Sequence, residues 1–329
     1  MLKGSDLKSI VDDLSGVLVQ APRAWLRVSG PDAAEFLQGQ CTQDLRGLAA
    51  GQAVWALWLT IKGRVVGESL ILRERSDQDA EGVWWLWSAY TGGEALRARL
   101  EEFIIADDVT VEDLGASGLW EHVTLAGPQA KAWLADQAGG APGPGEWRRA
   151  GEGWVFQGRR GAAACWEWLR PLAGAACLPA LGELRAETLV RARMATGVPA
   201  IPGEFGAGDL PQEAGLEAVA VSFTKGCYLG QEIMARLHAM GQVRRRLVRV
   251  AGDGPVPASG ATLLHEVGGK RAGELRAAVD DGRGGWLGLA MVNLLGLDPL
   301  KALKLGDDTP VGTGWSVVLL DQAGAGEGA

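Results

Sequence analysis

The sequence predicts an α+β fold in which two related α/β modules precede a small C-terminal domain of antiparallel strands. A strand–helix pattern occurs twice, in residues 26–37 (LRVSGPDAAEFL) and 123–134 (VTLAGPQAKAWL). A glycine- and proline-rich run, residues 251–260, then marks a change to short strands and glycine-rich turns. We therefore assign residues 1–250 to the paired modules and residues 251–329 to the C-terminal domain.

The two copies share the features that begin and end a helix. In each copy a short strand leads to a Gly-Pro pair, and Pro31 and Pro128 suit the first turn of the helix that follows. Gly39 in the first copy and the pair Gly139-Gly140 in the second then stop the helices. Two copies of one supersecondary unit predict two modules of the same topology.

Apolar and alternating runs predict the elements between and after the two copies. Residues 53–72 predict a hairpin that turns at Lys62-Gly63, and residues 83–90 predict a buried strand. Residues 92–103 have the apolar spacing of a helix, and residues 163–170 alternate with the period of a strand.

The composition limits the classes of function. Of the 329 residues, 47% are hydrophobic and 22% are charged, which is typical of a globular protein with a sizeable core. The net charge of −8 argues against a dedicated nucleic-acid binder. We find no run of roughly 18 apolar residues that could cross a membrane, and no apolar signal core near the N-terminus. We therefore expect a cytoplasmic protein with neither nucleic acid nor membrane as a partner.

The metal-ligating residues show no recognisable spacing. Cys41, Cys165, Cys177 and Cys227 form neither a CxxC pair nor a disulfide framework, which fits a reducing compartment. The three histidines are scattered along the chain. The sequence therefore predicts no zinc site.

The segment KGCYLGQE, residues 225–232, contains the strongest candidate for chemistry. Gly230 and Gly241 bound a predicted helix, so Cys227 lies in a glycine-flanked loop just before a helix N-terminus, two residues from Lys225. The helix dipole and a nearby cation both favour thiolate over thiol. Cys227 is therefore a candidate nucleophile or metal ligand, and a buried, inert cysteine is the alternative.

This segment, together with several others, resembles the YgfZ family of proteins. The resemblance extends through residues 197–232, and residues 26–45 and the run IKGRVV, residues 61–66, also match the family pattern. The family consists of folate-binding relatives of the glycine-cleavage aminomethyltransferases, and its members assist iron–sulfur cluster assembly. The mitochondrial assembly factors of this family are also similar around GCYLGQE and HAMGQVRRRL.

The resemblance implies a fold and a site. It implies an aminomethyltransferase-like fold with two α/β modules and a C-terminal β-barrel around a central hole. Cys227 would be the functional thiol and a ligand to a transient iron–sulfur cluster, and Lys225 would tune its charge. The partners would be tetrahydrofolate, iron–sulfur carrier proteins and apo client enzymes. The residues expected to contact the cofactor are Gly226, Tyr228, Gly230, Gln231, Glu232, Arg236, Glu213 and Arg64.

Two departures from the aminomethyltransferases favour the assembly-factor branch. Those enzymes carry a catalytic aspartate after a strand, and the run WSAYTGGEAL, residues 87–96, has Ala95 at the matched position. Without this carboxylate the folate amine loses the group expected to orient or activate it. Gly230-Gln231-Glu232 also stands where those enzymes have Gly-Arg-Glu. Whether the chain catalyses a reaction stays open.

A third departure concerns folate itself. Many relatives read R-x-E-x-G-x-P, with the glutamate expected to bond the pterin, and this chain has Ala195 at that place. Glu213, in the run LPQEAGL, is the remaining carboxylate that can face the pocket. Folate binding is therefore implied by the resemblance and is not secured by these residues.

Alternatives to the assembly role remain at this point. The chain can be a folate-dependent aminomethyltransferase, or a non-catalytic scaffold in which Cys227 is structural. Arg244, Arg245 and Arg246 form a basic spot in an acidic protein. This spot is either a solvated strand edge or a dock for a folate glutamate tail or an acidic partner surface.

Overall fold

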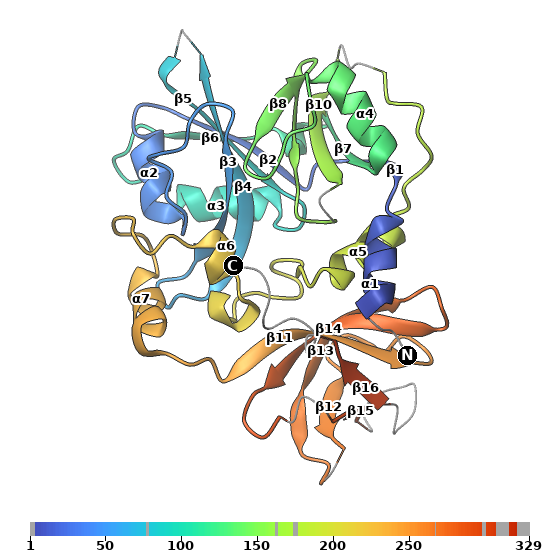
Figure 1. Ribbon diagram of the computed structural model, residues 1–329. Helices are drawn as coiled ribbons and strands as arrows, with labels where there is room; N and C mark the ends of the chain where they lie inside the picture. Colours follow the sequence, from blue (N-terminus) through green and yellow to red (C-terminus); the bar gives the residue numbers. More distant parts are fainter. Residues whose placement is uncertain are drawn as a thin grey trace.

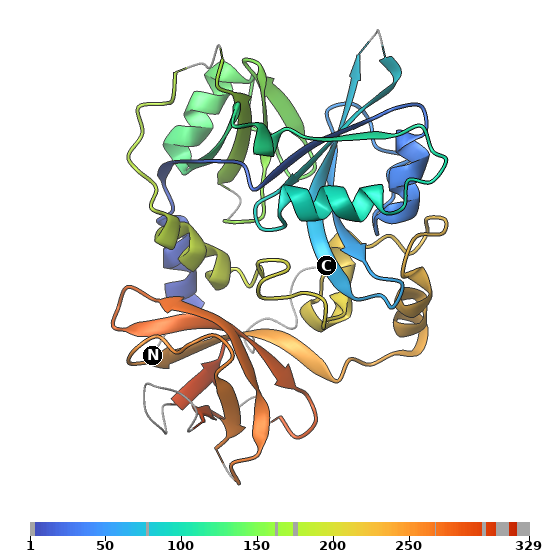
Figure 2. The same ribbon diagram turned by 180° about the vertical axis from the view of Figure 1, so that it is seen from behind.

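The computed structural model describes residues 4–76, 79–161, 164–173, 177–266, 268–297, 301–306 and 316–320. Two α/β modules lie side by side, and a β-barrel lies below them in the view of Figure 1. The segment that connects the second module to the barrel passes through the middle of the molecule, as Figure 2 shows from behind. This arrangement confirms the predicted fold class.

The first module is a five-stranded antiparallel sheet with the strand order β3-β4-β5-β2-β6. Two helices, α2 and α3, pack on one face through Leu37 and Leu96. The predicted hairpin forms, with its turn between β3 and β4 at Lys62-Gly63. The elements are β2 (Ala24–Ser29), α2 (Ala33–Gln40), β3 (Ala53–Leu59), β4 (Val65–Ser76), β5 (Asp79–Ser88), α3 (Gly93–Glu101), β6 (Thr110–Asp113) and the 3-10 turn η1 (Gly115–Ser117).

The second module is also a five-stranded antiparallel sheet, with the order β8-β9-β10-β7-β1. Helix α4 packs on one face through Ala130 and Leu134. The edge strand of this sheet, β1, precedes the first module in the chain. The elements are β1 (Gly16–Gln20), β7 (Trp120–Ala126), α4 (Pro128–Gln137), β8 (Trp147–Ala150), β9 (Gly153–Gln157) and β10 (Cys165–Pro171).

The two sheets have corresponding strand orders. In each module a strand, β2 or β7, leads into a helix, and three further strands form a meander. The last meander strand pairs back with the first strand, β5 with β2 and β10 with β7. Pro128 occupies the first turn of α4 as predicted, whereas α2 begins at Ala33, after Pro31.

Tryptophans from both sheets pack together where the two modules meet. The rings of Trp25 and Trp85, in the first sheet, stack with their centroids 4.8 Å apart. Trp154 of the second sheet lies 4.4 Å from Trp85 and 5.7 Å from Trp120. Because each indole buries a large apolar area, this cluster fixes the two sheets against each other.

The C-terminal domain is a closed barrel in which the strands run in the order β11-β14-β13-β12-β15-β16. It begins at Arg245, earlier than the boundary at residue 251, because the glycine–proline run that suggested the boundary includes the end of β11. The strands are β11 (Arg245–Asp253), β12 (Thr262–His265), β13 (Arg271–Asp280), β14 (Gly285–Asn293), β15 (Leu303–Leu305) and β16 (Ser316–Leu319).

Short helices connect the modules to the barrel. Helices α1 (Gly4–Asp12) and α5 (Ala186–Ala195) pack together against the barrel. The 3-10 turn η2 (Pro211–Ala214), α6 (Glu217–Ala220) and α7 (Gln231–Met240) follow, and α7 lies between Gly230 and Gly241 as predicted. Among the described residues, no helix combines the length and the apolar character needed to cross a membrane.

Candidate functional site

The Cys227 loop, residues 222–230, is fixed to the first module on both sides of its cysteine. The backbone N–H of Ser222 donates to the carbonyl oxygen of Thr42 at 2.9 Å. The N–H of Leu229 donates to the carbonyl oxygen of Gly39 at 3.1 Å. The loop therefore runs along the segment that follows α2 before it enters α7.

Lys225 is almost fully buried in this loop, and its ammonium points to the end of α2. Nζ donates to the carbonyl oxygens of Gln38, Cys41 and Gln43 at 2.6, 2.8 and 2.8 Å. An ammonium has three donors, so these bonds use all of them. We expected Lys225 to tune the charge of Cys227, but the structure directs this charge to α2 and to the thiol of Cys41. Burial lowers the pKa of Lys225.

Cys227 is exposed, whereas the neighbouring Tyr228 is buried in the core between the first module and the barrel. The ammonium of Lys225 lies 5.1 Å from the centroid of the Tyr228 ring, a cation–π distance. Burial raises the pKa of Tyr228 to about 12. Lys225 and Tyr228 therefore anchor the loop from inside, and the thiol between them stays accessible.

The two glycine motifs of the resemblance, IKGRVV and KGCYLGQE, meet at the start of α7. Gly230 has φ +85°, and a Cβ there would lie only 2.6 Å from the carbonyl oxygen of Thr60. A Cβ at Gly63, in the hairpin turn, would lie 3.0 Å from the Cβ of Ile233. Glycine at both positions lets the hairpin turn approach the helix. Gly226, in contrast, has open space where a Cβ would stand.

The remaining predicted residues of α7 lie at its first turns. Glu232 and Arg236 are exposed and form the expected i,i+4 pair, with 3.6 Å between their charged atoms. Gln231 is half-buried and takes the first position after Gly230. These three side chains therefore border the Cys227 loop, and their role toward a ligand remains a prediction.

Glu213 lies at the junction with the barrel, where its carboxylate is paired. Arg245 donates to Glu213 from Nε at 3.0 Å and from Nη2 at 2.8 Å. Arg245 also lies 3.3 Å from the buried carboxylate of Asp209. Glu213 therefore joins the modules to the barrel and does not line the cavity between the modules described below. Arg64 lies at the same junction and donates to the carbonyl oxygen of Gly208 at 2.9 Å.

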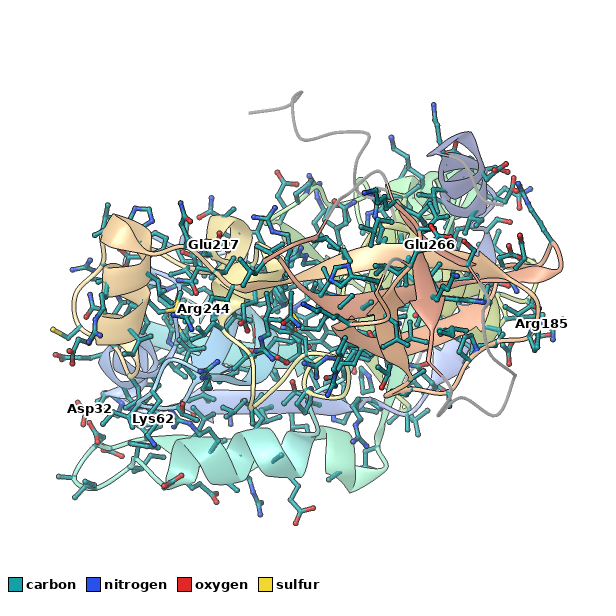
Figure 3. All side chains as sticks on the ribbon, turned by 90° about the horizontal axis from the view of Figure 1, so that it is seen from below. Asp32, Lys62, Arg185, Glu217, Arg244 and Glu266 are labelled. Carbon is teal, nitrogen blue, oxygen red and sulfur yellow. The ribbon has the colours of Figure 1, made fainter. Side chains whose placement is uncertain are left out.

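The predicted basic spot is split between the junction and the surface. Arg245 points inward to Glu213, whereas Arg244 and Arg246 are exposed. Figure 3 shows Arg244 and Lys62 on the side of the molecule that carries α7, away from Glu266 on the barrel. The surface near the Cys227 loop therefore includes exposed cationic side chains.

Ala95 lines a side pocket of about 560 Å³ between α3 and the β3–β4 hairpin. Leu229 of the Cys227 loop forms part of the same wall. Arg99 is held there by the carbonyl oxygen of Leu59 at 3.3 Å. The position matched to the catalytic aspartate thus faces a pocket, and it presents a methyl group where a carboxylate would be needed.

A central cavity of about 550 Å³ lies between the two modules. Its walls include Trp55 and Leu70 from the first sheet, and Gln157 and Arg159 from the second module. A smaller pocket shares these four residues and also reaches Glu68, Tyr90 and Arg160. The predicted hole is therefore a cavity with both aromatic and charged walls.

Arg159, which lines both the cavity and the adjoining pocket, and Glu68, which lines only the adjoining pocket, are residues that sequence reasoning missed. Glu68 is buried on β4 and accepts hydrogen bonds from Trp55 Nε1, at 2.7 Å, and from Ser88. Burial raises its pKa. The guanidinium of Arg159 lies 3.8 Å from the centroid of the Trp55 ring, and burial lowers its pKa to about 10. Its Nη1 is buried and has no hydrogen-bond partner within the part of the chain that the structure describes.

A buried polar cluster lies behind the cavity wall. His122 Nε2 lies 2.8 Å from Glu167 Oε2, and Arg160 donates to the same oxygen from Nη2 at 2.7 Å. Burial lowers the pKa of His122, and Arg160 lowers it further. Although burial opposes it, the bonds from Arg160 and His122 hold the pKa of Glu167 well below its usual range. The cluster therefore has an ionised carboxylate beside a neutral imidazole.

The four cysteines fall into two classes. Cys41 and Cys165 are fully buried, and burial raises the pKa of both thiols. Cys177 and Cys227 are exposed. Within the described ranges, no three His, Cys, Asp or Glu side chains are grouped to hold a metal ion. Ala195, the other matched position, packs in the core beside the barrel.

Comparison with known protein families matches two parts of the chain. Residues 16–141 match the GCVT N-terminal domain, and residues 244–315 match the CAF17 C-terminal β-barrel domain. The second match begins one residue before β11, in agreement with the structural start of the barrel.

Curated relatives cover most of the chain. The mitochondrial iron–sulfur cluster assembly factor IBA57 of Mus musculus is 33% identical over 288 residues, which are 82% of this chain and 75% of the relative. The human protein of the same name is 33% identical over 78% of this chain and 72% of its own length. The tRNA-modifying protein YgfZ of Cronobacter sakazakii is 28% identical over 78% of each chain.

A solved structure has the same fold. The crystal structure of the glycine cleavage system aminomethyltransferase T from Bartonella henselae matches 96% of this chain and 88% of its own, with a TM-score of 0.73. The sequences are 18% identical, so this likeness concerns the fold alone.

Proposed function

The chain belongs to the family that includes the IBA57 iron–sulfur cluster assembly factors and the YgfZ proteins, and we propose that it helps to assemble or repair iron–sulfur clusters. The observation that carries the proposal is the Cys227 loop, in which an exposed thiol sits between two buried anchors. A thiolate is the usual protein ligand of iron–sulfur clusters. Cys227 is the functional group in this proposal.

One thiol supplies only part of the ligand set of a cluster. Iron–sulfur clusters are commonly held by four cysteine thiolates, and the described residues offer no group of three metal-ligating side chains. The cluster is therefore a cargo held between Cys227 and ligands of a second protein. Cluster carriers and apo client enzymes are the partners that this chemistry requires.

Complementation tests the assembly role. A bacterial strain deleted for its own YgfZ would receive this chain, and the specific activity of an iron–sulfur enzyme would be measured against that of an enzyme without a cluster. We expect the iron–sulfur enzyme alone to recover. Equal activities with and without this chain, at normal expression, would contradict the proposal.

We also propose that the central cavity binds tetrahydrofolate. Trp55 and Arg159 line the cavity as a stacked indole and guanidinium pair, and planar groups of this kind can stack with a pterin ring. The unpartnered Nη1 of Arg159 is a donor for an acceptor of the ligand. Glu68, in the adjoining pocket, supplies a buried carboxyl group in place of the glutamate that Ala195 replaces. The residues present thus fit the cofactor, which carries one-carbon units when bound.

Tetrahydrofolate titration of the intrinsic tryptophan fluorescence tests this second proposal. Because Trp55 and Trp87 line the cavity and its adjoining pocket, binding should change their emission and saturate. Arg159→Met should weaken binding roughly tenfold, about the loss of one charged hydrogen bond. Arg185→Met, at a distant exposed position labelled in Figure 3, is the control and should bind normally. No saturable change in the wild-type protein would contradict folate binding.

A further inference from the structure

We infer that Lys225 is a positioning residue, which locks the Cys227 loop onto the end of α2 and so presents the thiol to a partner. The inference rests on the proposed role of Cys227 and adds a task for its neighbour. The lysine acts through α2 and its following segment, and it does not need to touch the cluster.

The position of the ammonium carries the argument. Gln38 belongs to the last turn of α2, and Cys41 and Gln43 follow directly. Carbonyl groups at a helix C-terminus lack partners within the helix and carry a partial negative charge. The Lys225 ammonium donates to the carbonyl of Gln38 in the last turn, to that of the C-cap Cys41 and to that of Gln43 just beyond the helix, at 2.6 to 2.8 Å. One side chain therefore completes the helix end and ties it to a loop that lies far away in the chain.

The backbone hydrogen bonds on either side of Lys225 depend on the same position of the loop against the end of α2. The bonds from Ser222 to Thr42 and from Leu229 to Gly39 flank the lysine on both sides. Thr42 Oγ1 also donates to the carbonyl oxygen of Ala220 at 2.6 Å. Without the ammonium, these three carbonyls would need other donors, and water is the nearest source. The loop would then open along segment 38–43.

Cys41 makes this opening measurable. Its thiol is fully buried and donates to the carbonyl oxygen of Gln43 at 3.4 Å, and its own carbonyl oxygen accepts from Lys225. Cys165, in the second module, is equally buried and takes no part in the contacts between Lys225 and the end of α2. A local opening should therefore expose Cys41 alone, whereas a general loss of stability should expose both thiols.

The experiment compares Lys225→Met with the wild type and with Lys131→Met, an exposed lysine of α4. Alkylation rates of the individual cysteines would be read by mass spectrometry under native conditions, and hydrogen exchange would follow the Ser222 and Leu229 amides. We expect Cys41 alkylation and exchange at both amides to rise about tenfold or more in Lys225→Met. Cys165 and the Lys131→Met protein should remain at wild-type rates.

Lys225→Arg keeps a buried cation, but its planar guanidinium cannot converge on three carbonyls as an ammonium does. It should open the loop to an intermediate degree, and it replaces the methionine variant if that protein does not fold. Unchanged Cys41 alkylation and unchanged amide hydrogen exchange in a folded variant would overturn the positioning role of Lys225. Equal acceleration of alkylation at Cys41 and Cys165 would also overturn it.

Complementation separates this inference from the proposed function. If the wild type complements and Lys225→Met opens the loop and loses most of that activity, the positioning role stands. If the loop opens and activity is unchanged, the positioning role is overturned while the assembly role survives. If the wild type itself fails to complement, the assembly role is contradicted and the lock is judged from alkylation and exchange alone.

Discussion

At the scale of single residues, the buried cluster of His122, Glu167 and Arg160 predicts how stability depends on pH. The pKa of Glu167 lies below its usual range, so its ionised form stabilises the fold above the ordinary carboxyl pKa and this contribution is lost as pH falls. The pKa of His122 is also lowered, so the unfolded chain takes up this proton first as pH falls below about 6.5. Both groups destabilise the fold in acid.

We therefore expect the free energy of unfolding to decrease between pH 7 and pH 5, with His122 contributing at most about 1.4 kcal/mol per pH unit. His122→Gln should flatten this part of the profile, because glutamine does not titrate. His238→Gln, on exposed α7, is the control and should keep the wild-type slope. Denaturant titrations at several pH values measure the effect, and identical slopes for the two variants would contradict it.

Single residues also show where sequence reasoning stops. The candidate Cys227 was predictable because its loop, glycines and helix start are adjacent in the chain. The target of Lys225 was not, since Gln38 and Cys41 are brought to it only by the folded chain. Glu68 was missed because one carboxylate in an apolar strand is indistinguishable from an ordinary solvent-facing residue until its strand is placed beside Arg159.

At the scale of elements, the contact between the β3–β4 turn and α7 depends on Gly230. A side chain there must adopt a positive φ and would also meet the carbonyl oxygen of Thr60. We expect Gly230→Ala to destabilise the protein by about 2–3 kcal/mol. Gly226→Ala, in the same loop but with open space at its Cβ, should change stability by less than about 0.5 kcal/mol. Thermal unfolding of the two variants checks the difference, and equal midpoints would contradict it.

The elements themselves were largely predictable, but one pairing was not. The repeated strand–helix unit predicted β2 with α2 and β7 with α4, because hydrophobic period and helix-boundary glycines are local signals. The strand β1 pairs with β7, in the second sheet, although it precedes the first module in the chain. No local pattern carries that information, since pairing across 100 residues is decided by which sheet edge is free. The barrel begins earlier than the boundary expected at residue 251, because β11 continues through the glycines that suggested a break.

At the scale of the whole molecule, the fold is that of an aminomethyltransferase, yet Ala95 stands in the side pocket at the position where we expect the catalytic aspartate of those enzymes. We expect no methylene transfer from an aminomethylated carrier protein to tetrahydrofolate above the uncatalysed rate, because Ala95 offers no group to orient or activate the folate amine. A direct assay with a glycine-cleavage aminomethyltransferase as the positive control measures this. Robust turnover by this chain would contradict this expectation.

The architecture is compatible with the proposal that the exposed Cys227 loop serves a partner. The tryptophan cluster fixes the two sheets, the Arg245 ion pairs fix the barrel, and the Cys227 loop lies on the outer side of this frame. A rigid frame leaves the thiol in one position, which a second protein can meet without ordering a flexible segment.

The measurement that tests the central claim most directly is complementation by matched cysteine variants. Cys227 and Cys177 are both exposed, so Cys177→Ser is a control of equal accessibility for Cys227→Ser. In the strain deleted for YgfZ, both variants should accumulate to wild-type levels. We predict that Cys177→Ser restores the iron–sulfur enzyme activity and that Cys227→Ser does not. Full restoration by Cys227→Ser would contradict the claim that this thiol handles the cluster.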